Sequence, residues 1–426
     1  MLKEQNIAEA KEKRGEVSLS GWVHEVRNLG KLKFVLLRDW TGTIQITAKQ
    51  GKVSEEVLKA MDVNKEDVVY VRGEVVENKV APDGVEIIPK EFKLLGKVTK
   101  KLPVDPTGVV DSEMDTRLDY RFIDLRKKHV LTIFRIKSQI VNAFRNTLLE
   151  KGFIEIHPSL IIGAASEGGA DVFPIQYFER KAYLAQSPQI YKQLAVVGGL
   201  EKVFITTPVF RAEKHNTTTH LNEIIQMDIE AAFYTDKEAI EMLIHVFKEM
   251  LRRIDKEDVL SVNKEFREIK NVKVYTYTEL VELLNENNYR MEWGSDFSKE
   301  AEKKLYEILN EDAFVIKDWP TKVRAFYSMP YEENEEICKA YDLMYMGMEI
   351  ASGAQRIHIP ELLEEQIRKR GLDPLDFEFY IDAFRYGAPP HAGWSFGLER
   401  LTMTVTGVKN IREAMLFPRD RMRIHP

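Results

Sequence analysis

The chain has 426 residues, of which 44% are hydrophobic and 31% are charged, and its net charge is −6 at pH 7. This length suits two or three domains with real cores, and the mild acidity gives no general sign of nucleic-acid binding. The single cysteine, Cys338, excludes a disulfide scaffold and a thiolate metal cluster. A polar beginning and the lack of a long apolar run predict a cytoplasmic protein with no membrane span.

The first part of the chain predicts a small β-barrel. Five short alternating runs between residues 17 and 97 are separated by glycine and aspartate, and a helical insert falls near residues 54–61. This pattern is typical of a five-stranded Greek-key barrel of the OB type. We place this domain at residues 1–100 and a linker at 101–130, where two prolines interrupt regular structure.

The remainder, residues 131–426, predicts a second domain of the α+β class. Apolar residues recur at helical spacing from Ile136 to Leu148, and Gly152 follows as a stop. Short strands then alternate with helices, which favours a large antiparallel sheet flanked by helices. Residues 255–335 are rich in charge and look like an insertion.

The stretch VFRAEKHNTTTHLNE carries the first candidate site. We expect Arg211 and Glu213 on one face of a strand, because side chains alternate along strands. An arginine fork can clamp a phosphate, a glutamate can accept from an adenine amino group, and His220 can reach terminal phosphates. The chain has no Gly-rich phosphate loop, so side chains would have to hold a nucleotide. The alternative is an exposed charged hairpin.

The stretch HAGWSFGLERL suggests a second arginine at the same ligand. Gly393 and Gly397 permit a close approach to the backbone, and Arg400 near the start of a helix can contact phosphates or adenine. The alternative is a Gly-rich turn that carries a surface arginine.

Two further stretches carry polar groups in apolar surroundings. In YDLMYMGMEIASGAQRIH, Glu349 and Ser352 offer hard oxygen ligands suited to Mg²⁺ beside bound phosphates, with Asp342 upstream. Arg356 lies in a run of small residues and calls for an anionic partner. In AYLAQSPQIYKQ, polar groups around a proline turn suggest a small polar ligand, and a solvated helix start is the alternative.

Together these motifs resemble the class II aminoacyl-tRNA synthetases, and closely the archaeal-type aspartyl-tRNA synthetases, over nearly the whole chain. Motif 1 ends in FIEIHPSL, motif 2 reads FRAEKHNTTTHLNE and motif 3 contains GLERL, while the tail LFPRDRMRIHP is similar to this subgroup. The resemblance implies ATP-dependent activation of L-aspartate to aspartyl-adenylate with Mg²⁺, followed by transfer to tRNA(Asp). It also implies a homodimer.

The resemblance assigns a role to each matching residue. The catalytic residues are Arg211 and Arg400. The aspartate-binding residues are Glu167, Ser187, Gln189, Lys192, Arg211, Asp228, Ser352 and Arg356. The ATP-binding residues are Arg211, Ala212, Glu213, Thr219, His220, Leu221, Glu349, Gly397, Leu398, Glu399 and Arg400. The metal ligands are Glu349 and Ser352.

Within that set, Lys192 and Arg356 are expected to pair with the side-chain carboxylate of aspartate, and Asp228 to meet its α-ammonium. Two cations facing one carboxylate would disfavour asparagine in a dry site.

Three positions depart from the family pattern. Ser159 stands where motif 1 usually has its proline, which bears on the local interface geometry. Thr219 stands where many relatives have arginine, so a phosphate contact is expected to be missing. Ile224 replaces a phenylalanine that some relatives stack on adenine.

The barrel is expected to read the anticodon. The residues expected to contact it are Arg27, Phe34, Gln45 and Glu86. Phe34 could stack an unpaired base, and such stacking contributes about 1–3 kcal/mol per base. The alternative for Phe34 is a core aromatic.

Two barrel positions bear on which tRNA is charged. Relatives restricted to the aspartate tRNA tend to carry tryptophan and lysine where this chain has His24 and Pro82. We therefore expect Asp-tRNA to be made on both tRNA(Asp) and tRNA(Asn), with an amidotransferase completing Asn-tRNA. The alternatives are a synthetase restricted to tRNA(Asp), an asparaginyl-tRNA synthetase, an amino-acid-activating enzyme related to asparagine synthetases, and a catalytically silent RNA-binding paralogue.

Overall fold

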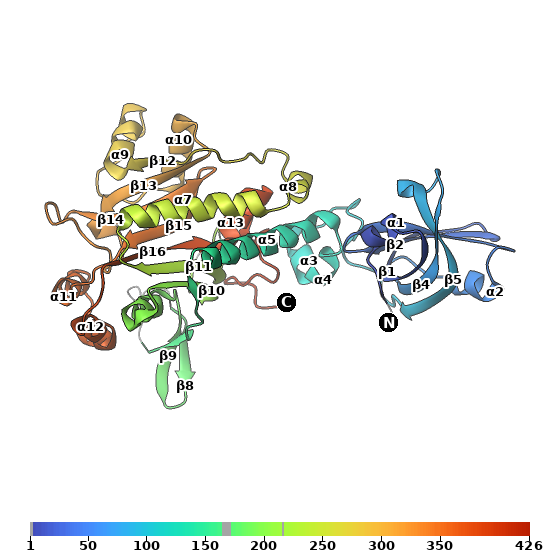
Figure 1. Cartoon of the computed structure of the whole chain (residues 1–426), viewed down its shortest axis with the longest axis horizontal. Helices are drawn as coiled ribbons and strands as arrows, with labels where there is room; N and C mark the ends of the chain where they lie inside the picture. The colour runs from blue at the N-terminus through green and yellow to red at the C-terminus, as the bar shows by residue number, and fades with distance from the viewer. Residues whose placement is uncertain (1–2, 164–171, 215–216) are drawn as a thin grey trace. The chain divides into compact units, whose positions relative to one another are not determined.

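The computed structural model describes residues 3–163, 172–214 and 217–426. Contacts divide the chain into two compact units, Met1–Leu131 and Thr132–Pro426, and each is described by itself. Figure 1 shows the elements of both units. Over the described ranges, no helix is both long enough and apolar enough to cross a bilayer.

The first unit is a closed five-stranded barrel, as the sequence predicts. Its strands are β1 (Gly15–Asn28), β2 (Leu32–Asp39), β3 (Gly42–Lys49), β4 (Val68–Glu77) and β5 (Val85–Gly96), in the order β1-β2-β3-β5-β4. Alternate side chains of each strand point inward, so Leu19, Val35 and Ile46 are fully buried. Only β3 and β5 pair in parallel among these strands.

Short helices accompany the barrel. They are α1 (Ile7–Glu12), α2 (Glu55–Ala60), η1 (Pro82–Gly84), α3 (Met114–Asp119) and α4 (Arg121–Asp124). The helix α2 lies where the sequence predicts an insert. The segment expected as a linker thus contains two helices, and contacts group it with the barrel. The buried Arg121 donates to Asp124 at 2.9 Å within α4.

The second unit is built on an eight-stranded sheet with the order β12-β13-β14-β15-β16-β11-β10-β6. The strands are β6 (Ile154–Glu155), β10 (Lys202–Phe210), β11 (Glu223–Ala232), β12 (Lys273–Thr276), β13 (Ala313–Pro320), β14 (Ile337–Tyr345), β15 (Met348–Gln355) and β16 (His391–Gly397). The six central strands are antiparallel, as expected, whereas the outermost pair at each edge is parallel. The sheet is therefore mixed at its edges.

Long helices cover one face of this sheet. The helices α5 (Lys128–Glu150) and α7 (Asp236–Arg253) run across it in Figure 1. The predicted apolar positions of α5 from Ile136 to Leu148 are buried in the main core, and Gly152 ends the turn after it with φ +77°. A capping box between Thr235 and Glu238 begins α7.

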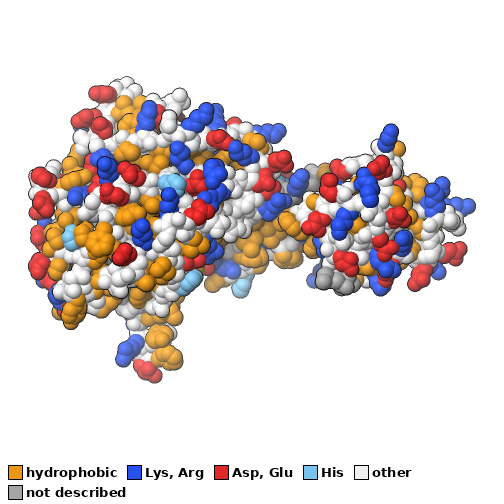
Figure 2. Space-filling model, viewed as in Figure 1, with side chains coloured by type: hydrophobic (Ala, Val, Ile, Leu, Met, Phe, Trp, Pro, Cys, Tyr) orange, Lys and Arg blue, Asp and Glu red, His pale blue; other side chains and the backbone are white. Residues whose placement is uncertain are grey.

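The segment expected as an insertion is part of the main fold. It supplies strands β12 and β13 to one edge of the sheet, together with α8 (Lys256–Val262), α9 (Tyr277–Glu286) and α10 (Lys299–Leu309). Figure 2 shows acidic and basic side chains mixed over the visible face of this unit.

The remaining elements complete the second unit. They are a small sheet of β7 (Ile161–Ile162), β8 (Pro174–Tyr177) and β9 (Arg180–Leu184), and the helical segments α6 (Gln189–Ala195), η2 (Val196–Leu200), η3 (Thr321–Val323), α11 (Pro360–Lys369), η4 (Pro374–Phe377), α12 (Glu378–Arg385), α13 (Leu398–Thr406) and η5 (Ile411–Ala414).

Strand β10 is shorter than the sequence suggests. It ends at Phe210, so Arg211 and Glu213 lie just beyond it and not on one face of a strand. The side-chain amide of Asn222 donates to the carbonyls of both residues, at 2.7 Å and 3.3 Å. Together with the backbone bond from the N–H of Arg211 to the carbonyl of Asn222, at 2.8 Å, these bonds hold the chain as it leaves the sheet. The expected strand through FIEIHPSLII is likewise reduced to β6 and β7.

Candidate active site

Two cavities open side by side on the second unit. Strands β11, β15 and β16 form their common wall, and five residues line both of them, namely Arg211, Gln226, Glu349, Ser352 and Ser395. The first cavity extends toward the motif 2 loop and the start of α13, and the second extends toward α6 and Arg356. The two cavities therefore form one continuous candidate site.

Most of the expected nucleotide residues line the first cavity. They are Arg211, Glu213, Thr219, His220, Leu221, Glu349, Gly397, Glu399 and Arg400. Ala212 lines a neighbouring cavity under the C-terminal tail, and Leu398 packs into the main core.

Most of the expected aspartate residues line the second cavity. They are Ser187, Gln189, Lys192, Arg211, Asp228, Ser352 and Arg356. Glu167 lies outside the described residues.

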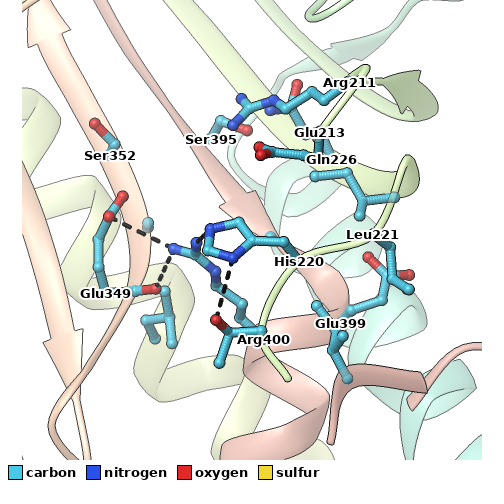
Figure 3. Close-up of a pocket in the computed structure, with 16 residues that line it drawn as sticks. Arg211, Glu213, His220, Leu221, Gln226, Glu349, Ser352, Ser395, Glu399 and Arg400 are labelled. Carbon is cyan, nitrogen blue, oxygen red and sulfur yellow. Dashed lines mark hydrogen bonds and ion pairs between the residues drawn. The ribbon is translucent and has the colours of Figure 1, made fainter. Parts of the chain in front are cut away.

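Arg211 is the one cation common to the two cavities. It is partly buried, and its guanidinium forms no hydrogen bond or ion pair with any side chain that the structure describes. A half-buried guanidinium without a protein partner is poised for an anionic ligand. Figure 3 shows it near Ser395 and Gln226, and the buried Oε1 of Gln226 also lacks a partner.

At the other end of the first cavity, Arg400 lies between Glu349 and His220 (Figure 3). Its guanidinium donates to the carbonyl of Glu349 at 3.2 Å and lies 3.5 Å from the Glu349 carboxylate. It also donates to Nε2 of His220 at 3.3 Å. Nδ1 of this ring is then the protonated nitrogen, and it lies 2.8 Å from the Thr217 hydroxyl.

The histidine is held in its neutral form. Burial lowers the pKa of His220 below its usual value, and the charge of Arg400 lowers it further. A neutral His220 can donate or accept a hydrogen bond at this end of the cavity without adding charge.

Glu399 and Gly393 support the site from behind. The carboxylate of Glu399 is buried, where it accepts from Lys137 at 2.6 Å and from the backbone N–H of Ile225 at 2.9 Å. A Cβ at Gly393 would lie 2.4 Å from a carboxylate oxygen of Glu230, so this glycine makes room for a neighbouring strand and not for a ligand. Gly397 does line the first cavity.

A buried network of two cations and two carboxylates forms the floor of the second cavity. Lys192 donates to Asp228 at 2.9 Å and lies 3.5 Å from Glu230, while Arg356 donates to Glu230 at 3.1 Å. Ser395 donates to the second oxygen of Asp228 at 3.0 Å. The expected cations are therefore present together, but each already has an internal carboxylate as partner.

The two carboxylates differ in their electrostatic surroundings. Burial raises the pKa of Asp228, and the opposing charge of Lys192 does not offset it fully. Burial acts in the same direction on Glu230, but Arg356 and Lys192 outweigh it and leave the pKa lowered. Glu230 therefore stays ionised as the structural partner of both cations.

Two further carboxyl groups, those of Asp342 and Glu302, lie beside Glu349. Burial raises the pKa of Asp342 to about 7, although Arg324 forms an ion pair with it. Burial also raises the pKa of Glu302, on α10, to about 8, and the charge of Glu349 adds to the rise. These carboxyl groups crowd one end of the site, where a cation would relieve their repulsion.

A third cavity lies on the barrel. It is lined by Glu25, Arg27, Phe34, Leu36, Gln45, Asn78, Val80 and Pro82. Phe34 thus belongs to a surface cavity and not to the barrel core. The buried Glu86 accepts from Gln45 at 2.9 Å and so holds its side chain in place.

His24 does not line that cavity. Its Nδ1 accepts a hydrogen bond from Arg38 at 2.8 Å, and Arg38 donates in turn to the buried Glu66 at 2.8 Å. Burial lowers the pKa of His24, and Arg38 lowers it further.

Comparison with known proteins decides the family. Residues 113–421 match the model for "tRNA synthetases class II (D, K and N)", and residues 17–95 match an "OB-fold nucleic acid binding domain". The first match covers more than half of the chain. The chain belongs to the class II tRNA synthetases of the D, K and N group.

Individual relatives agree with this assignment. The chain is 48% identical to an "Aspartate--tRNA(Asp/Asn) ligase" of Methanopyrus kandleri over 100% of both chains. It is 47% identical to the protein of the same name from Methanocaldococcus jannaschii, over 96% of this chain and 95% of that one.

Solved structures of synthetases share the fold. An asparaginyl-tRNA synthetase from Pyrococcus horikoshii complexed with asparaginyl-adenylate matches with a TM-score of 0.94 and 32% identity over 100% of both chains. An aspartyl-tRNA synthetase from Entamoeba histolytica matches with a TM-score of 0.88 and 32% identity, over 100% of this chain and 93% of that one.

Several residues of this synthetase site were missed at the level of sequence. Glu230 and Arg324 are ion-pair partners of expected residues, and Gln226 and Ser395 lie in the shared wall. Gln226 and Asp228 lie two apart on β11, so strand alternation could have indicated that both face the site. Nothing local in the sequence marks Arg324, because its partner Asp342 lies on another strand.

Proposed function

We propose that this chain joins aspartate to tRNA in two steps and accepts both tRNA(Asp) and tRNA(Asn). The observation that carries the choice of amino acid is the charge of the second cavity. Four cations line it, namely Lys192, Arg211, Arg324 and Arg356. Lys192, Arg356 and Arg324 have carboxylate partners in Asp228, Glu230 and Asp342, and the Glu349 carboxylate in its lining pairs with Arg400 of the first cavity. Among the described residues this leaves the positive charge of Arg211 without a carboxylate partner. Aspartate carries one net negative charge and balances it, whereas asparagine is neutral overall.

The amino acid is proposed to lie in the second cavity. Arg211 would bind its α-carboxylate and Asp228 its α-ammonium, while Lys192 and Arg356 would receive the side-chain carboxylate. Ser187, Gln189 and Ser352 would supply further hydrogen bonds. Because the two cations are held by Glu230, they can exchange a carboxylate partner without moving far, and this lowers the cost of rearrangement on binding.

ATP is proposed to lie in the first cavity. Glu213 would accept from the adenine amino group, Arg211 would contact the α-phosphate, and Arg400 with His220 would hold the distal phosphates. An oxygen of the aspartate α-carboxylate then attacks the α-phosphorus in line, the bond to the β-phosphate oxygen breaks, and pyrophosphate leaves. No residue has to remove a proton, so the site acts by orientation and charge stabilisation.

Mg²⁺ is proposed as a cofactor held by Glu349 and Ser352. Asp342 pairs with Ser352 across β14 and β15, and its buried Oδ1 lacks a partner, so the donor set fits a hard cation. The remaining ligands of the ion would come from phosphates and water. When bound, the ion would neutralise charge on the phosphates.

The barrel is proposed to bind the anticodon through the third cavity. Phe34 would stack a splayed base, with Arg27 and Gln45 hydrogen-bonding at its edges. Pro82 lines the same cavity and offers no backbone donor, which supports tolerance of more than one base at one anticodon position. An amidotransferase would then convert the Asp-tRNA(Asn) product, and the enzyme would act as a cytoplasmic homodimer.

ATP–pyrophosphate exchange tests the amino-acid assignment. With Mg²⁺ present, we expect exchange with aspartate and at least about a hundredfold less with asparagine, since a charge mismatch in a buried site costs several kcal/mol. Comparable exchange with asparagine would contradict the assignment. Exchange with neither amino acid would favour a silent RNA-binding paralogue.

A further inference from the structure

We propose that Lys299, from the segment 255–335, is a phosphate-binding residue of the ATP site. It would contact the distal phosphates of ATP and the pyrophosphate product. This inference rests on the proposed place of ATP in the first cavity. It gives a role in catalysis to a segment that carries none of the three synthetase motifs.

The position of Lys299 carries the argument. It is the first residue of α10, and its ammonium donates to the hydroxyl of Thr219, which lines the first cavity. The same hydroxyl lies 3.3 Å from Nδ1 of His220, whose Nε2 accepts from Arg400. A short chain of contacts thus joins Lys299 to the two groups proposed to hold the distal phosphates.

The charge of Lys299 is not used elsewhere. In the part of the chain that the structure describes, it forms no ion pair, and its one side-chain hydrogen bond goes to a neutral hydroxyl. A cation at the N-terminal end of a helix opposes the helix dipole, so this position does not favour lysine for stability. Lys299 is exposed, so an anionic ligand at the cavity rim can reach its ammonium.

The neutral side chain at this point of the motif 2 loop suits the same assignment. Thr219 carries no charge, and Lys299 brings one positive charge to it from another element. Its charge already acts within the site, since it helps to lower the pKa of His220 after burial and Arg400.

The geometry of α10 fits this role. The helix packs against β15, the strand that carries Glu349. Glu302 follows Lys299 by three residues, so the two share a face of the helix. The charges of Glu349 and Arg400, which both line the first cavity, act on Glu302.

The test compares ligands with and without the distal phosphates. Lys299→Met removes the charge, Lys299→Arg retains it, and Lys303→Met changes an exposed lysine on the same helix. Each variant and the wild type are titrated by calorimetry with ATP and with AMP in the presence of Mg²⁺ and without an amino acid. A charge-assisted contact predicts that Lys299→Met weakens ATP binding about tenfold.

The other expected results follow from the same contact. AMP affinity should stay within about twofold in every variant, and Lys299→Arg and Lys303→Met should bind ATP within about threefold of the wild type. In exchange assays the KM for pyrophosphate should rise in Lys299→Met while the KM for aspartate stays unchanged.

Two results would overturn the inference. Unchanged ATP affinity in Lys299→Met would show that Lys299 does not contact the phosphates of ATP. An equal loss of ATP and AMP affinity would mean that Lys299 only holds the motif 2 loop. Because binding is measured without an amino acid, a wrong choice of amino acid under the proposed function would leave this test intact.

Discussion

Ion pairs hold several of the charged side chains at this site in place. Lys192 is buried and touches both Asp228 and Glu230, so it is the cation on which two carboxylates depend. The guanidinium of Arg211 by contrast forms no hydrogen bond or ion pair with the described side chains. Lys192 therefore stabilises the shape of the pocket, whereas Arg211 is available to bind a ligand.

Replacing Lys192 with methionine tests its proposed role in the aspartate site. The variant should raise the KM for aspartate at least about tenfold, because the side-chain carboxylate of aspartate loses one of its two proposed charge-assisted partners. The KM for ATP should change by less than about twofold. Steady-state exchange at varied aspartate and ATP measures both, and the thermal midpoint checks that the variant is folded. Equal effects on the two substrates would show that Lys192 does not belong to the aspartate site.

The raised pKa of Glu302 predicts a dependence of stability on pH. Burial and the charge of Glu349 raise its pKa in the folded state to about 8, against 4.5 for the ordinary group. As pH rises from about 4.5 to about 8, the unfolded chain releases this proton first, so Glu302 costs stability over that window. Glu302→Gln mimics the protonated form. The difference in free energy of unfolding between this variant and the wild type should therefore grow as pH rises from about 4.5 to about 8, and stay constant above that.

Urea denaturation at pH 4.5, 6, 7, 8 and 9 measures this difference. An advantage that is the same at every pH would mean that Glu302 titrates normally. Glu300→Gln, at an exposed position of the same helix, serves as the control and should show no such growth with pH.

At the level of elements, the C-terminal tail clamps the motif 2 loop. Arg412 donates to Asp420 at 2.7 Å and to the carbonyl of Thr217 at 3.1 Å, and the N–H of Ile411 donates to the carbonyl of Thr218 at 2.8 Å. From the other side, the N–H of Asn222 donates to the carbonyl of Arg419 at 2.8 Å. The loop is thus fixed at both ends by residues beyond motif 3.

Asp420→Ala should loosen this clamp. We expect a loss of about 1–3 kcal/mol in stability, because Arg412 keeps a buried charge without its carboxylate. The KM for ATP should rise while the KM for aspartate changes little, since Thr219, His220 and Leu221 of the loop line the first cavity and not the second. Asp420→Asn, which retains hydrogen-bond acceptance, should be milder. An unchanged KM for ATP in a destabilised Asp420→Ala variant would separate the tail from the nucleotide site.

The sequence predicted those elements whose pattern is local. The barrel strands alternate cleanly, and the apolar period of α5 leads from Ile136 to a glycine stop, so both are confirmed. The end of β10 before Arg211 was missed because the chain there is held by side-chain bonds from Asn222, eleven residues later, which no local pattern contains. The strands β12 and β13 were read as an insertion because their pairing with the main sheet is a tertiary fact.

The same distinction holds for the site. Arg211, Glu349 and Arg400 belong to recognisable motifs, and the structure brings them together. Arg324 and Lys299 reach the site from segments whose local sequence resembles an ordinary charged surface. Their importance depends on which strand or loop packs beside them, which no local pattern contains.

At the scale of the whole molecule, we propose that the choice of tRNA depends on the barrel. His24 and Pro82 are the two predicted readers, but they lie in different surroundings. Pro82 lines the third cavity, whereas His24 accepts a hydrogen bond from Arg38 outside it. Pro82→Lys would therefore act directly by adding a donor to the cavity, and His24→Trp would act through Arg38.

The paired variant His24→Trp with Pro82→Lys should shift charging toward tRNA(Asp). We expect the ratio of kcat/KM for tRNA(Asp) over tRNA(Asn) to rise at least about tenfold, which corresponds to about 1.4 kcal/mol. Each single variant measured beside the pair shows which position carries the effect. A ratio unchanged in all three variants would mean that other residues read the anticodon.

The most direct test of the whole account is the charging of purified tRNA(Asn) with labelled aspartate by the wild-type enzyme. We predict Asp-tRNA(Asn) formation with a kcat/KM within about tenfold of that for tRNA(Asp), because the barrel cavity is proposed to accept either base. A kcat/KM lower by more than about a hundredfold, or about 2.8 kcal/mol, would contradict the claim and indicate an enzyme restricted to tRNA(Asp).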